Sequence, residues 1–145
     1  MEQETEKKNT FFRFEDLRIY HKALDYIKWS QKSLAEATLD GSQNVSEHFM
    51  TSSRNIALNI AEGSARNKNQ FIYYLKMAKS AVRECLVLTT ILRNTDIWDE
   101  LNEEHSRSQL IEMTKMLGAL ITSLQRSNSG NPSNNHNDDR DYNSY

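Results

Sequence analysis

The sequence predicts an all-α fold, an antiparallel four-helix bundle with up-down-up-down connections. Glycine and proline, which helix interiors tolerate poorly, number only 4 and 1 among 145 residues. Apolar residues recur at three- to four-residue steps in four separate stretches, and the alternation typical of β-strands is absent. Four amphipathic helices with short connections bury their apolar stripes most simply against one another.

The first two helices are predicted on either side of a turn at 39–42. The first spans about 16–37, and the second begins near Asn44, which has Glu47 at the spacing of a capping box. Gly63 is expected to end the second helix in the left-handed conformation of a C′ residue. The expected apolar stripe of the first helix comprises Leu17, Ile19, Tyr20, Ala23, Leu24, Ile27, Leu34 and Ala35. That of the second comprises Met50, Ile56, Ala57, Ile60 and Ala61.

The third and fourth helices are predicted on either side of the polar run at 94–96. The third begins near Asn67, which has capping-box spacing to Gln70, and the fourth spans about 100–125. The expected stripe of the third helix comprises Phe71, Tyr74, Leu75, Ala78, Val82, Cys85, Leu86, Thr89 and Leu92. That of the fourth comprises Leu101, Leu110, Met113, Leu117, Leu120, Ile121 and Leu124.

Two polar segments flank the predicted folded body at 11–126. Residues 1–10 and 127–145 have too few aliphatic side chains to offset the entropy of ordering, so both are expected to be disordered. The polar start is not expected to be a signal peptide, and no apolar run approaches the roughly 20 residues of a membrane span. The single cysteine, Cys85, cannot form an internal disulfide, and a cytoplasmic protein is therefore expected.

Catalytic and metal-binding motifs are not visible, so neither an enzyme nor a cofactor is predicted. Di-metal bundles use Glu-x-x-His motifs, and none of the 4 histidines has an acidic residue three positions before it. Zinc sites need more cysteines or clustered histidines, and no glycine-rich nucleotide loop occurs. Cys85 lies between Val82 and Leu86 and is expected to be a small core residue rather than a nucleophile.

Two carboxylates, Glu62 and Glu84, adjoin apolar stripes and are expected to be partly buried. Buried carboxylates need partners, and the candidates are Asn59, Arg54, Arg66, Ser80 and the backbone N–H groups at the start of the third helix. We interpret the group as a polar latch between the second and third helices, with general acid–base chemistry as the alternative. On this interpretation Asn59 and Glu62 hold the connection, and Glu62→Ala costs about 1–3 kcal/mol.

The charge distribution bears on nucleic-acid binding. The body at 11–126 has fifteen Lys and Arg against fourteen Asp and Glu, a net +1 that is small for a dedicated nucleic-acid binder. Basic and aromatic residues nevertheless interleave on the first and third helices, a combination that can grip RNA. The candidate nucleic-acid contacts are Arg18, Lys22, Lys68, Lys76, Lys79 and Arg83. The alternative is that these residues only solvate outer helix faces.

Several stretches resemble the motifs of one family. FEDLRIYHKALDY at 14–26 is similar to its opening signature, and NIALNIAEGSAR at 55–66 to its Asn-Ile-Ala-Glu-Gly run. FIYYLKMAKSAVRE at 71–84 and KMLGALITSL at 115–124 resemble its third-helix and closing segments. These motifs are those of the four-helix bundle, ribosomal-protein-like proteins encoded in intervening sequences of bacterial 23S ribosomal RNA genes. The resemblance covers about 11–126.

The resemblance implies a bundle that assembles as a ring, typically a pentamer. A relative, the accessory protein of diversity-generating retroelements, is a basic pentameric barrel that binds nucleic acid and partners a reverse transcriptase. The residues that match the family signature are Asn59, Glu62, Gly63, Arg66, Ser80 and Glu84.

Two function classes therefore stay open. The first is a non-enzymatic, ring-forming protein that binds RNA, DNA or a nucleic-acid enzyme, which requires the basic residues of the first and third helices to face a common groove or channel. The second is a structural or protein-binding bundle whose exposed aromatic residues, Tyr26, Trp29 and Tyr73, form the interface of a homo-oligomer.

Overall fold

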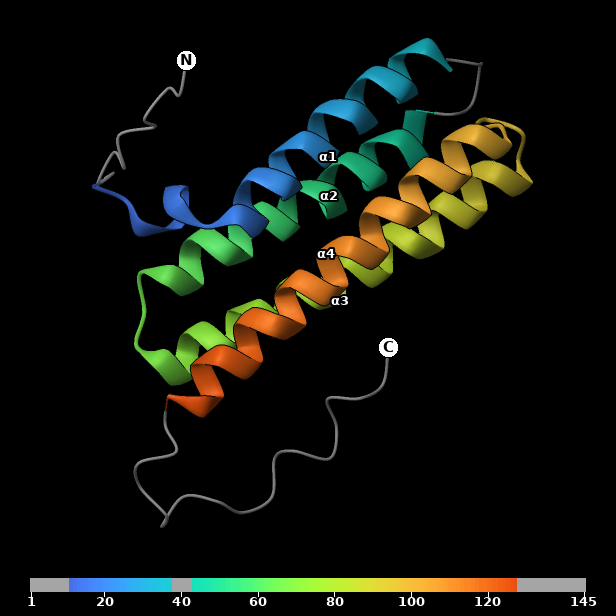
Figure 1. Cartoon of the computed structure of the whole chain (residues 1–145). Coiled ribbons are helices and arrows are strands. Elements are labelled where there is room, and N and C mark those ends of the chain that lie inside the picture. Colours follow the sequence, from blue (N-terminus) through green and yellow to red (C-terminus); the bar gives the residue numbers. More distant parts are fainter. Residues whose placement is uncertain (1–10, 38–42, 128–145) are drawn as a thin grey trace, which may run out of the picture.

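Four α-helices preceded by a short 3-10 helix make up the fold. The computed structural model describes residues 11–37 and 43–127. The elements are η1 (Arg13–Asp16), α1 (Arg18–Glu36), α2 (Gln43–Ser64), α3 (Lys68–Asn94) and α4 (Glu100–Arg126). Successive helices run in opposite directions (Figure 1), and the described ranges contain no strand. The predicted up-down-up-down bundle is confirmed.

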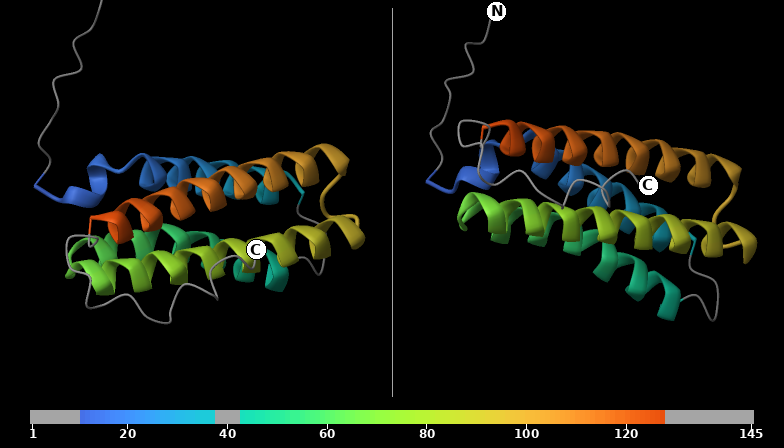
Figure 2. Two further views of the ribbon diagram at one scale, coloured as in Figure 1. Left: turned by 60° about the horizontal axis from the view of Figure 1, so that its bottom comes forward. Right: turned by 90° about the horizontal axis from the view of Figure 1, so that it is seen from below.

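The helices contact one another around a ring. α2 packs against α1 and α3, and α4 packs against α3 and α1, whereas the backbones of the diagonal pairs, α1 with α3 and α2 with α4, do not approach closely. Two further views show this four-cornered arrangement (Figure 2). The outer surfaces of α1 and α3 therefore face different sides of the bundle.

The core is largely apolar, and besides the buried serines Ser33, Ser52 and Ser53 it contains a polar layer around Tyr26 made of Ser30, Thr89 and Ser106. Tyr26 is only 1% exposed, and Ser30 of the same helix is fully buried. Leu24, which the sequence pattern placed in the core, is 40% exposed. The predicted apolar stripe of α1 therefore included Leu24, which is exposed, and missed Tyr26 and Ser30, which are buried. Polar groups such as these can enter a core when they find hydrogen-bond partners there. Ser30 meets this condition by donating to the Tyr26 carbonyl at 2.7 Å.

A chain of hydroxyl groups joins three helices in this layer. The Tyr26 hydroxyl lies 2.8 Å from Ser106 Oγ, and Ser106 Oγ lies 2.7 Å from Thr89 Oγ1. Thr89 donates to the Cys85 carbonyl at 2.7 Å. Because a hydroxyl has one proton, Thr89 accepts from Ser106, and Ser106 accepts from Tyr26. Burial raises the pKa of the Tyr26 hydroxyl, which keeps it protonated as the first donor.

The starts of α3 and α4 follow the local sequence, whereas the predicted start of α2 needs a correction. The Asn67 side chain accepts from the Gln70 backbone N–H at 3.0 Å, as its capping-box spacing predicts, and Asp99 caps α4 in the same way. Asn44 does not precede α2 but lies within it, since α2 includes Gln43. α3 ends at Asn94, where the polar run was expected to interrupt the pattern, and Asp96 in the following turn has a left-handed φ of 59°.

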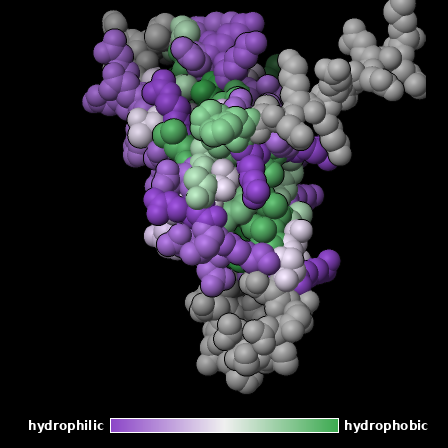
Figure 3. All heavy atoms as spheres, turned by 90° about the vertical axis from the view of Figure 1, so that its left-hand side faces the viewer, coloured by the Kyte–Doolittle hydropathy of each residue, from purple (hydrophilic) through white to green (hydrophobic). Residues whose placement is uncertain are grey.

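The η1 end of the molecule is rich in aromatic side chains. Phe14 contacts Phe12 and Tyr20, with ring centroids 5.8 and 5.0 Å apart, and this row fixes η1 against α1. Seen from this end, apolar side chains reach the surface among hydrophilic ones (Figure 3). None of the described helices is long and apolar enough to cross a membrane. The disorder predicted for 1–10 and for 128–145, like the turn at 39–42, falls outside the described residues, whereas Ser127, the first residue of the predicted tail, is the C-cap of α4.

Candidate functional site

Gly63 allows α2 and α3 to approach closely beside their connection. The residue is buried within α2 and does not have a left-handed φ, so its predicted role as a C′ residue was wrong. A Cβ atom at this position would lie 2.6 Å from Tyr74 Cβ and 2.9 Å from Phe71 Cδ2. The glycine is therefore needed because any side chain would collide with α3.

The predicted polar latch does not form at this corner. Arg66 does pair with a carboxylate, since its Nε donates to Glu62 Oε1 at 3.1 Å, but both side chains are about half exposed. Asn59 donates to the Asn55 carbonyl at 2.8 Å, a bond inside α2. The expected burial of Glu62 was wrong, and an exposed ion pair contributes little to stability. Glu62 therefore bonds to the connection only through this exposed pair with Arg66, and the Asn59 side chain bonds within α2 instead.

The two residues of α3 that match the family signature, Ser80 and Glu84, have different hydrogen-bond partners. Glu84 is exposed rather than partly buried, yet it accepts a hydrogen bond at 3.0 Å from Ser52, a buried hydroxyl of α2. Ser80 instead accepts from Arg83 Nη2 at 3.0 Å. No group of three His, Cys, Asp or Glu side chains in the described ranges could hold a metal ion. Of the six signature residues, Gly63 and Glu84 thus act between α2 and α3, whereas the side-chain bonds of Asn59 and Ser80 described above stay within their own helices.

Three of the candidate nucleic-acid contacts form a basic stripe on α3, which we define as Lys76, Lys79 and Arg83. Their spacing of three and four residues places them on one side of the helix. Partial burial and the neighbouring charges of Arg83 and Lys76 lower the pKa of the Lys79 ammonium. Glu84, the one acidic residue of α3, lies beside the stripe, about 100° around the helix from Arg83, and bonds to Ser52 of α2.

The remaining basic candidates lie elsewhere. Lys22 of α1 is half-buried and forms an ion pair with Glu112 of α4 at 2.8 Å. Arg18 is exposed at the start of α1, and Lys68 begins α3. Because α1 and α3 occupy diagonal positions, their basic residues do not share a groove within one protomer. Nucleic-acid binding was predicted to require that the basic residues of α1 and α3 face a common groove or channel. A single chain does not meet this requirement.

The three aromatic residues that were predicted to form an interface differ in their exposure to solvent. Tyr26 is buried in the core and cannot be an interface residue, so that assignment was wrong. Trp29 is half-buried against Trp98 and His105, with ring centroids 5.2 and 4.4 Å away. Tyr73 alone of the three is well exposed.

Sequence reasoning missed an apolar seam on α3, which we define as Tyr73, Met77, Val87 and Ile91. These side chains are 57, 41, 59 and 40% exposed. Ser80 and Glu84 lie between Met77 and Val87 in the sequence. With them, the six positions follow one another at alternating steps of four and three residues, which places all six on one side of the helix. The signal was a second set of apolar residues at heptad spacing beside the core stripe. α3 therefore carries the apolar seam on the side toward α2 and the basic stripe next to it.

A family model described as 23S rRNA-intervening sequence protein matches residues 15–119. The chain belongs to this family. The match begins in η1 and ends in α4, so it includes the α2–α3 corner, the basic stripe and the apolar seam. Membership in the 23S rRNA-intervening sequence protein family confirms the resemblance carried by the motifs of α1, α2 and α3. No curated protein matches the chain. The relationship to retroelement accessory proteins stays a prediction.

Proposed function

We propose that this 23S rRNA-intervening sequence protein is a non-enzymatic, self-associating protein that binds nucleic acid through the basic stripe. The observation that carries the proposal is the placement of three cations on one side of α3, where partial burial and then the charges of Arg83 and Lys76 lower the pKa of Lys79. A phosphate entering between them relieves their mutual repulsion and releases its own counterions. Backbone phosphates of RNA or DNA supply such charges at regular intervals.

The uneven charge of the fold supports this proposal. α3 contains five basic residues and one acidic residue, although the body as a whole is nearly neutral. The acidic residues concentrate at the start of α4 and just before it, at Asp96, Asp99, Glu100, Glu103 and Glu104. A locally positive surface attracts polyanions even when the net charge is close to zero.

The test is fluorescence anisotropy with a structured RNA and a DNA duplex over a range of salt concentrations. The double variant Lys79→Gln/Arg83→Gln should bind about tenfold or more weakly, and the slope of log K against log salt for DNA should fall by about 2. The matched control is Lys28→Gln/Lys32→Gln, which removes two exposed charges from α1 and should change little. Equal losses in both variants, or no binding by the wild type at low salt, would contradict the proposal.

Self-association is the second part of the proposal and rests on the apolar seam. Aromatic residues and methionine are enriched at interface cores, and the seam presents both on one helix. The same seam favours the second candidate function, a protein-binding bundle that does not bind nucleic acid. The family resemblance favours a pentameric ring as the assembly.

Light scattering coupled to size-exclusion chromatography counts the subunits. The wild type should be oligomeric, and Met77→Ser/Val87→Ser should shift the assembly toward monomer without changing its charge. The matched control Leu101→Ser/Ile111→Ser replaces two exposed apolar residues of α4 and should stay oligomeric. A monomeric wild type would refute self-association, while an oligomer that binds neither RNA nor DNA would favour the second candidate function.

A further inference from the structure

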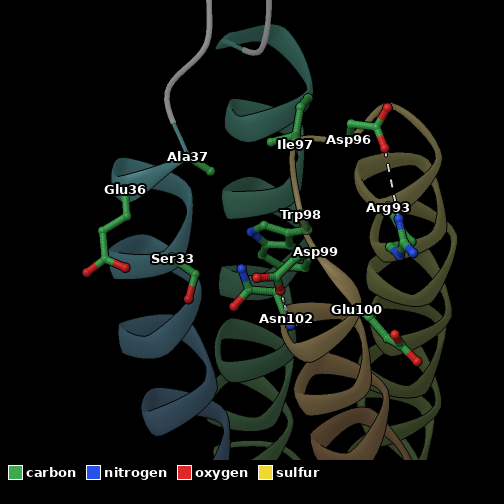
Figure 4. A pocket seen from close by; sticks show the side chains of 10 residues that line it. All are labelled: Ser33, Glu36, Ala37, Arg93, Asp96, Ile97, Trp98, Asp99, Glu100 and Asn102. Carbon is green, nitrogen blue, oxygen red and sulfur yellow. Dashed lines mark hydrogen bonds and ion pairs between the residues drawn. The ribbon is translucent and has the colours of Figure 1, made fainter.

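An acidic pocket lies at the end of the bundle where α1 ends and the α3–α4 connection crosses over. Its volume is about 410 Å³, and Figure 4 shows the side chains that line it. The walls come from the last turn of α1, the end of α3, the connection and the first turn of α4. The lining residues used below are Ser33, Glu36, Arg93, Asp96, Trp98, Asp99 and Glu100.

An unpaired hydrogen-bond donor lines this pocket. Trp98 is 1% exposed, and its Nε1 has no hydrogen-bond partner. Figure 4 shows the indole nitrogen directed toward α1, the helix that carries Ser33 and Glu36. Contacts with Trp29 and Phe49, at centroid distances of 5.2 and 5.1 Å, hold the indole in this orientation. A fixed, buried N–H without an acceptor favours a ligand that supplies one.

The charge of the pocket restricts that ligand further. Four carboxylates line it, and Arg93 is the one cation in its lining. Arg93 is already paired with Asp96 and Glu103, at 3.9 Å each, and Asp99 accepts from the Asn102 backbone N–H. Glu36 and Glu100 form no ion pair with another residue of the described ranges. The pocket therefore attracts a positive group.

Few ligand classes combine a cation with a hydrogen-bond acceptor. A polyamine supplies cations but no acceptor for the indole N–H, and a phosphate supplies acceptors but is repelled by the carboxylates. A peptide supplies a backbone carbonyl together with an Arg or Lys side chain. We propose that the acidic pocket binds a basic peptide segment of a partner protein, with its cation held by the acidic lining and a carbonyl accepting from Trp98.

Two-dimensional NMR of ¹⁵N-labelled protein tests this directly, because the chain has only 2 tryptophans and hence two indole signals. The probe is acetyl-Gly-Arg-Gly-amide, and Trp98→Phe assigns the Trp98 signal by removing it. The peptide should move the Trp98 indole proton downfield. Its citrulline analogue, which keeps the shape and loses the charge, should bind about tenfold more weakly. Spermine should leave the indole proton in place.

Variants that preserve the fold provide the second measurement. Glu36→Gln/Glu100→Gln changes two exposed side chains and should weaken peptide binding several-fold, with a melting curve like that of the wild type. The matched control Asp25→Asn/Glu47→Gln removes two exposed acidic residues outside the pocket and should bind normally. An indole signal unmoved by the peptide, equal binding of the citrulline analogue, or equal losses in both variants would each overturn the proposal.

Discussion

Gly63→Ala is expected to destabilise the bundle, even though alanine is the better helix former. The new Cβ would lie 2.6 Å from Tyr74 Cβ, whereas ordinary contacts of this kind begin at 3.4 Å. Rotation of the Phe71 ring can relieve the contact at 2.9 Å. Tyr74 Cβ is attached directly to the α3 backbone, so α2 and α3 must move apart by the difference of 0.8 Å.

Two opposing energies determine the size of the effect. Forcing extra volume into a packed interface costs about 1–3 kcal/mol. Replacing a helical glycine by alanine returns about 0.5–1 kcal/mol. The difference between these two ranges is about 0–2.5 kcal/mol, centred near a net loss of about 1 kcal/mol, which lowers Tm by roughly 4 °C in a domain of this size. Urea and thermal unfolding followed by far-ultraviolet circular dichroism measure both quantities.

Gly118→Ala is the matched control because it makes the same substitution inside α4. A Cβ atom at Gly118 meets nothing within 4 Å, so only the gain in helix propensity remains. This variant should be more stable than the wild type by about 0.5–1 kcal/mol. Opposite signs for the two variants are the result we expect. A Gly63→Ala protein that melts at or above the wild-type temperature would refute the close-approach explanation.

Two further predictions concern the polar layer of the core. Ser106→Ala leaves the buried Tyr26 hydroxyl without an acceptor and should cost about 1–3 kcal/mol in urea unfolding, more than the roughly 1 kcal/mol of Tyr26→Phe. The reverse order would contradict the donor direction assigned to the chain. Burial raises the pKa of the Cys85 thiol from 9.0 to about 12. The folded state therefore binds more protons between these values, and stability should fall as pH rises through that window. Cys85→Ala should lose less stability there, and an equal loss would show that this thiol does not contribute.

The sequence predicted the helices because periodicity reports burial directly. Every predicted helix is present within about two residues, and the capping interaction of Asn67 is as expected. Periodicity misassigned part of α1 because hydropathy gives no information about partners. Tyr26 is buried where Ser106 of a distant helix accepts its hydroxyl, a pairing that local spacing cannot show.

The candidate site was predictable only in part for a similar reason. Spacing along one helix was enough to group Lys76, Lys79 and Arg83 on α3. Whether Lys22 of α1 joined them depended on helix order around the bundle, which an amphipathic pattern leaves open. Gly63 was misinterpreted because a helix end and a close helix approach both favour glycine, and only the position of Tyr74 distinguishes them.

The apolar seam and the basic stripe are coupled if both parts of the proposed function hold. They lie side by side on α3, so subunits that associate through the seam would bring their basic stripes near one another. Several weakly binding stripes on one assembly gain affinity through effective concentration, without any change in the charge of each chain. This coupling explains how a body of net charge +1 can bind a polyanion.

The coupling also makes the neutral variant Met77→Ser/Val87→Ser decisive. Loss of nucleic-acid binding together with assembly would show that the assembled array is the binding unit, whereas full binding by the monomer would show that one stripe is sufficient.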